Sequence, residues 1–128
     1  MATASESDLL LPFAWSIHAK ASALRGLELT SSQCARMLEA ISDDIKTCTN
    51  FIAPEVSRAA LDEARRLGVD LYVKNWHDQP RFDKGRKTFH FEHIVPVSAI
   101  RQECMAETSQ IGVHDILRTR LRVVSFRS

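Results

Sequence analysis

Residues 30–51, TSSQCARMLEAISDDIKTCTNF, hold the clearest structural pattern in this 128-residue chain. Thr30 and Gln33 have the spacing of a capping box, and Leu29 and Cys34 are placed to form a hydrophobic staple across it. Apolar residues then recur every three or four positions on one helical face: Cys34, Met37, Leu38, Ile41, Ile45 and Cys48. The segment therefore predicts an amphipathic helix that begins after Thr30 and ends at about Phe51.

Two further helices are expected on either side of this segment. Over residues 12–25 the apolar positions recur at spacings of four and three, Pro12 suits a first helical turn and Gly26 suits a stop. A third helix is predicted over residues 54–67, with Pro54 at its start and Gly68 just past its end. The first half of the chain therefore reads as helical.

The spacing of the apolar residues changes after Gly68. Residues 69–74 alternate between apolar and polar side chains, which favours a short strand, with a continuing helix as the alternative. Residues 76–87, WHDQPRFDKGRK, are rich in charge and contain Pro80 and Gly85, which predicts an exposed loop.

A second strand is predicted over residues 88–95, where Phe89 and Phe91 lie on one face and Thr88, His90 and Glu92 on the other. Pro96 ends it. The rest of the pattern predicts a helix over residues 99–107 capped by Ser98, a helix over 113–120 after Gly112, and a terminal strand over 121–126.

These elements predict a single α+β domain over residues 1–128 that is mostly α: three N-terminal helices, then a small strand and helix unit. The net charge of +1 divides unevenly between the two parts. Residues 1–73 contain seven Lys and Arg against ten Asp and Glu, whereas residues 74–128 contain ten against six. We therefore describe residues 1–68 as a helical part and 69–128 as a basic α+β part, where four of the five histidines lie.

Composition limits the cellular setting. The apolar runs are only a few residues long, so no membrane span is expected. No basic patch precedes the first apolar stretch, which argues against a secretory signal and for a cytoplasmic protein. The three cysteines (Cys34, Cys48 and Cys104) are widely spaced, and we expect buried, reduced thiols rather than a disulfide framework or a thiolate zinc site.

The most informative motif lies in the predicted second strand, where residues 89–98 read FHFEHIVPVS. A carboxylate followed at once by histidine, an apolar pair and proline resembles the first motif of HNH (ββα-metal) nucleases, Asp-His-Ile-Val-Pro-x-Ser, with Glu92 in place of Asp. The resemblance implies a metal-dependent endonuclease that hydrolyses DNA or RNA, with Glu92 as a metal ligand and His93 as the general base. A regular strand directs these two side chains to opposite faces, so a shared site requires a bend, which Pro96 could supply.

The resemblance also implies further metal ligands. No asparagine follows Asn75, so His114 and the adjacent Asp115 are the candidates for the second metal-binding element, and His90 is either an extra ligand or a surface residue of the strand. A site of carboxylate and imidazole favours Mg²⁺ or Mn²⁺, and a second histidine would also suit Zn²⁺ or Ni²⁺.

Basic residues around the motif suggest a nucleic-acid partner. We expect phosphate contacts from Lys84, Arg86, Lys87 and Arg101. The aromatic residues Trp76, Phe82, Phe89 and Phe91 either stack on bases or, as is more common beside strands, fill a core.

A different class of function remains open. The chain could be a non-catalytic helical binding or inhibitor protein of phage or plasmid type, with Glu92 and His93 as a structural pair. It could also be a shortened relative of an enzyme that has lost part of its site. A protein partner or a homodimer is compatible with either alternative.

Overall fold

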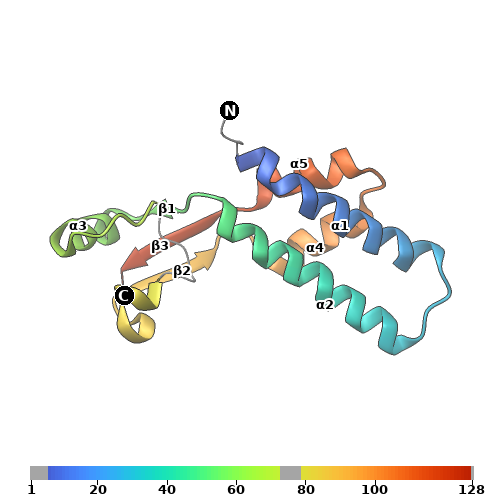
Figure 1. Cartoon of the computed structure of the whole chain (residues 1–128), viewed down its shortest axis with the longest axis horizontal. Coiled ribbons are helices and arrows are strands. Elements are labelled where there is room, and N and C mark those ends of the chain that lie inside the picture. The colour runs from blue at the N-terminus through green and yellow to red at the C-terminus, as the bar shows by residue number, and fades with distance from the viewer. Residues whose placement is uncertain (1–5, 73–78, 128) are drawn as a thin grey trace.

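The computed structural model describes residues 6–72 and 79–127. Four helices form one end of the molecule: α1 (Glu6–Gly26), α2 (Ser31–Cys48), α4 (Val97–Ala106) and α5 (Gln110–Arg120). A small sheet and α3 (Arg58–Leu67) form the other end (Figure 1). The architecture is α+β and mostly α, as the sequence predicts.

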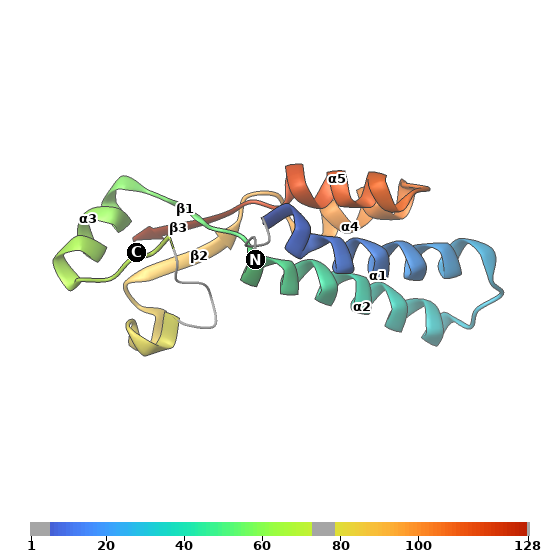
Figure 2. The same ribbon diagram turned by 45° about the horizontal axis from the view of Figure 1, so that its top comes forward.

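The helical end is built around one apolar core. Helices α1 and α2 run antiparallel, and α4 and α5 pack against them (Figure 2). The fully buried side chains of this core include Ile17, Ile41, Ile45, Ile100 and Leu117. The capping box predicted at Thr30 is present, because the Gln33 amide donates to Thr30 Oγ1 and the Thr30 amide donates to Gln33 Oε1.

The sheet has three strands in the order β1-β3-β2. Strand β1 (Glu55–Val56) pairs parallel with β3 (Val123–Arg127), and β2 (Phe89–His93) pairs antiparallel with β3. The sheet therefore takes strands from both halves of the chain. A second core of Ala60, Ala64, Leu71 and Phe89 lies between α3 and the sheet.

Several element boundaries differ from those predicted for the helical half. Helix α1 begins at Glu6, so Pro12 lies inside it, and the added turns bury Leu10. Helix α3 begins at Arg58 behind the cap of Ser57, because residues 55–56 pair with β3. Its predicted stop is confirmed: Gly68 has a φ of 71°, which favours glycine.

The strand predicted over residues 69–74 is wrong for its described part, since residues 71–72 form a turn in which Asp70 Oδ1 accepts from the Tyr72 amide. Its last two residues lie outside the described chain, as do residues 76–78 of the predicted loop. The rest of that loop forms two 3₁₀ turns, η2 (Gln79–Arg81) and η3 (Lys84–Arg86). It is not fully exposed, because Gln79 and Asp83 are buried.

Strands β2 and β3 lie where the sequence predicts them, but the two helices between them begin earlier. Helix α4 begins at Val97, with Pro96 rather than Ser98 at its N-cap. Helix α5 begins at Gln110, capped by Ser109, and so includes Gly112. A side chain at Gly112 would collide with Glu107. No helix among the described residues is long and apolar enough to cross a membrane.

Candidate functional site

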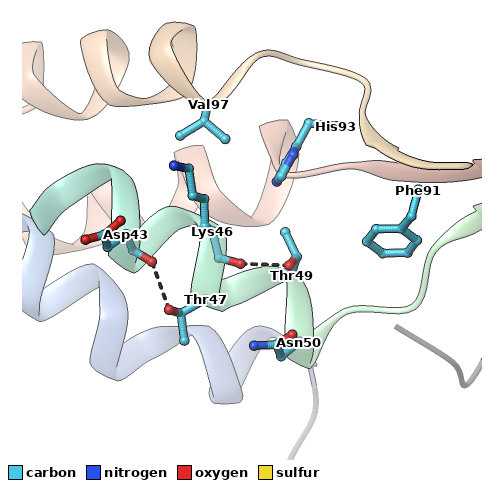
Figure 3. Close-up of a pocket in the computed structure, with 8 residues that line it drawn as sticks. All are labelled: Asp43, Lys46, Thr47, Thr49, Asn50, Phe91, His93 and Val97. Carbon is cyan, nitrogen blue, oxygen red and sulfur yellow. Dashed lines mark hydrogen bonds between the residues drawn. The ribbon is translucent and has the colours of Figure 1, made fainter. Parts of the chain in front are cut away.

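A pocket of about 500 Å³ lies where the two ends of the molecule meet. It is bounded by the C-terminal end of α2, the 3₁₀ turn η1 (Thr49–Phe51), the end of β2 and the start of α4 (Figure 3). Its lining residues are Asp43, Lys46, Thr47, Thr49, Asn50, Phe91, His93 and Val97. We call this the His93 pocket, because the histidine of the sequence motif faces it.

The alternation of β2 places His93 in this pocket. Phe89, Phe91 and His93 share one face of the strand, and the first of these side chains is buried in the second core. Phe82 contacts Phe89 with ring centroids 5.9 Å apart, so these two rings fill a core. Phe91, by contrast, lines the pocket.

The His93 imidazole has an unusual environment. Its Nε2 atom is buried and has no hydrogen-bond partner among the described residues. Burial lowers the pKa of His93 below its ordinary value of 6.5, and the positive charge of Lys46 lowers it further. The ring is therefore largely neutral at pH 7, and a neutral Nε2 accepts a proton when it carries the ring's lone pair.

The last turn of α2 is fixed by two side-chain hydrogen bonds. Thr47 Oγ1 donates to the Asp43 carbonyl at 2.8 Å, and Thr49 Oγ1 donates to the Lys46 carbonyl at 2.7 Å (Figure 3). These bonds hold the backbone from which Lys46 enters the pocket. No described carboxylate lies within 4.0 Å of the Lys46 ammonium, so its charge is available to an anionic ligand.

Glu92 occupies the other face of the strand. It is exposed and pairs with Val124, while His93 pairs with Val123, so β2 stays regular through both residues. The bend that would bring their side chains together does not occur within the strand. His90 lies on the same exposed face as Glu92 and stacks on Phe126 at 5.2 Å.

The proposed second metal-binding element lies on α5. Asp115 forms an ion pair with Arg118 at 3.2 Å, and His114 is half-buried. Within residues 6–72 and 79–127, no group of three or more His, Cys, Asp or Glu side chains could hold a metal ion. The imidazole and carboxylate groups that line the pocket are those of His93 and Asp43.

The predicted phosphate-binding residues are divided between two places. Lys84 and Lys87 are exposed and Arg86 is half-buried, and all three precede β2. His93 is the last residue of this strand, about 13 Å from its first residue, Phe89. Arg101 lies on α4, close to the pocket, where its Nη1 donates to Ser42 Oγ at 3.0 Å. Trp76 lies outside the described residues.

Sequence reasoning missed Asp43 and Lys46, which stand three residues apart in the final turns of α2. The sequence does not distinguish Lys46 from an ordinary helix-terminal residue, because a Lys near a helix C-terminus commonly stabilises the helix dipole. Sequence reasoning also missed the buried carboxylate of Asp83, which accepts from the amides of Thr88 and Phe89 and holds the start of β2. Comparisons with protein-family models, curated proteins and solved structures gave no match.

Proposed function

We propose that this protein is an HNH-like endonuclease that hydrolyses phosphodiester bonds of DNA or RNA in the His93 pocket. The observation that carries the proposal is His93, whose buried Nε2 atom has no described partner and whose side chain lines a pocket that Lys46 also lines. A neutral imidazole beside a free ammonium is suited to accept a proton while a neighbouring anion is held in place.

The chemistry follows from these two groups. His93 takes a proton from the attacking water, whose oxygen forms the new bond to phosphorus. The bond from phosphorus to the leaving oxygen breaks, and that oxygen takes a proton from solvent. Lys46 offsets the negative charge that builds up on the phosphoryl oxygens during this exchange. Each of these steps uses His93 and Lys46 alone.

The decisive experiment is a cleavage assay with labelled single-stranded DNA, duplex DNA and RNA, in Mg²⁺, Mn²⁺, Zn²⁺ or Ni²⁺ and in EDTA. We expect cleavage by the wild type, and a loss of about 10²-fold or more in H93A. H18Q is the matched control, because His18 lies on α1 and its Nε2 contacts the Thr108 carbonyl at 3.2 Å, a contact that glutamine can keep. Absence of cleavage in every condition, or equal cleavage by H93A, would overturn the proposal.

The role of Glu92 as a metal ligand stays a prediction, and E92Q tests it in the same assay. Loss of metal-dependent cleavage in E92Q would support a metal site on the exposed face of β2. Unchanged cleavage would leave the carboxylate without a catalytic role.

The alternative, a non-catalytic binding protein, agrees with the opposite orientations of Glu92 and His93, because these residues do not share a catalytic site. The same orientations separate the two side chains, so they do not form the structural pair expected from the sequence. This alternative predicts that E92Q and H93N lower the melting temperature and leave activity unchanged. The endonuclease proposal predicts the reverse for H93N: loss of cleavage with stability close to that of the wild type.

A further inference from the structure

A second pocket of about 350 Å³ adjoins the His93 pocket. The two share Asp43 and Lys46, and the second is also lined by Glu39, Ser42 and Arg101. Together they form a groove between α2 and α4, which we call the α2–α4 groove. Val97 lines the first pocket, and Arg101 lines the second. These two residues are four positions apart on α4, which is about one helical turn, or roughly 5.4 Å along the helix axis.

Arg101 is held in this groove with most of its binding capacity unused. Its Nη1 donates to Ser42 Oγ at 3.0 Å, which links α4 to α2 and fixes the guanidinium. No described carboxylate lies within 4.0 Å of the Arg101 guanidinium, although Glu39 and Asp43 line the same pocket. Four of the five N–H donors of the side chain are therefore free of described protein partners, and their fork suits a phosphate group.

We infer that the α2–α4 groove binds two successive phosphates of one nucleic-acid strand, the reacting phosphate between His93 and Lys46 and its neighbour at Arg101. This inference rests on the proposed function, whose substrate class it narrows to a strand that carries a flanking phosphate. One helical turn is comparable to the separation of adjacent phosphates along a strand. The strand therefore follows α2 and α4, and leaves the Lys84 and Lys87 loop at the other end of β2 without a phosphate contact.

The carboxylates in the groove predict an effect on binding opposite to that of Arg101. Glu39 is paired with Arg36 at 3.4 Å, so part of its charge is offset. Asp43 has no ion pair among the described residues and lines both pockets. A phosphate strand in the groove is repelled by this charge, so D43N should bind it more tightly than the wild type.

The experiment measures binding of a short labelled single-stranded DNA by fluorescence anisotropy, in EDTA and across a series of NaCl concentrations. We expect R101Q to weaken binding several-fold and to lower the slope of log K against log salt by about 0.7, the contribution of one single-strand phosphate contact. We expect D43N to strengthen binding. R58Q is the matched control, since Arg58 is exposed on α3, far from the groove, and it should bind as the wild type does.

A second substrate separates binding from chemistry. Bis(p-nitrophenyl) phosphate has a single phosphate, so R101Q should lose less activity toward it than toward the oligonucleotide, for which its KM should rise. R58Q should hydrolyse both substrates as the wild type does. Weakened binding in R101Q without cleavage by any variant would support the strand path and overturn the proposed function. Equal binding by R101Q and wild type, or weakening only in K84Q and K87Q, would overturn the strand path even if the protein cleaves DNA.

Discussion

Replacement of His93 by leucine should make the protein more stable and inactive. The His93 Nε2 atom is buried without a described partner, and an unsatisfied polar atom of this kind costs about 1–3 kcal/mol. Because the side chain as a whole is only half-buried, we take the lower end of this range, about 1 kcal/mol. Leucine is apolar and of similar size, so H93L should recover this free energy of unfolding. For a chain of this length the gain corresponds to a melting temperature higher by about 4 °C.

The gain should depend on pH. The pKa of His93 is lower in the folded protein than its ordinary value of 6.5, because of burial and Lys46. As the pH falls below 6.5, the unfolded chain binds a proton at this residue before the folded protein does, and wild-type stability decreases. H93L has no such group, so its advantage over the wild type should grow between about pH 7 and pH 5.

Urea unfolding followed by circular dichroism at both pH values measures this difference. F91L is the matched control, since Phe91 lines the same pocket and carries no polar atom. Its effect on stability should be independent of pH. The reasoning is refuted if H93L is less stable than the wild type by more than about 1 kcal/mol at both pH values, because His93 would then hold a stabilising hydrogen bond.

Two further predictions concern other parts of the fold. D83N should lower the free energy of unfolding by about 2 kcal/mol, because the Asp83 carboxylate accepts charge-assisted bonds from the Thr88 and Phe89 amides. Burial opposes the ionisation of Asp83, yet its hydrogen bonds hold its pKa below 3.8. The difference in unfolding free energy between D83N and the wild type, measured by urea unfolding, should therefore shrink as the pH falls through the folded pKa. Equal stability of the two proteins at pH 7 would contradict this role. Burial raises the pKa of the Cys48 and Cys104 thiols to about 12, whereas Cys34 is half-exposed. A thiol reagent should therefore label one cysteine in the native protein and three in urea. Faster labelling of Cys48 or Cys104 than of Cys34 would argue against the buried core.

The features that sequence analysis predicted correctly are those fixed by neighbouring residues. The capping box of Thr30 and Gln33 closes within four residues, and the left-handed stop at Gly68 depends on one glycine. The alternation of β2 is equally local. A regular strand places His93 and Glu92 on opposite faces, and the bend that a shared site required does not occur within it.

The errors arose where distant contacts decide the structure. Strand β1 has two residues, and only its pairing with β3, nearly 70 positions later, makes it a strand. Residues 69–72 alternate as a strand would, but Asp70 accepts the Tyr72 amide and turns the chain. The His93 pocket could not be predicted for the same reason, because Lys46 and Asp43 come to line one pocket with His93 only in the folded chain, where α2 packs against α4.

The environment of His93 supports the functional role that we propose for this residue. The hydroxyl of Thr49, which also lines the pocket, donates to the Lys46 carbonyl at 2.7 Å. Lys46 in turn disfavours protonation of the imidazole. The arrangement costs stability through an unsatisfied buried nitrogen, and below about pH 6.5 it also costs stability through the lowered pKa. Costs of this kind are typical of sites where a ligand completes the missing interactions. A phosphodiester and its attacking water would complete both, with an anion for Lys46 and a proton for His93.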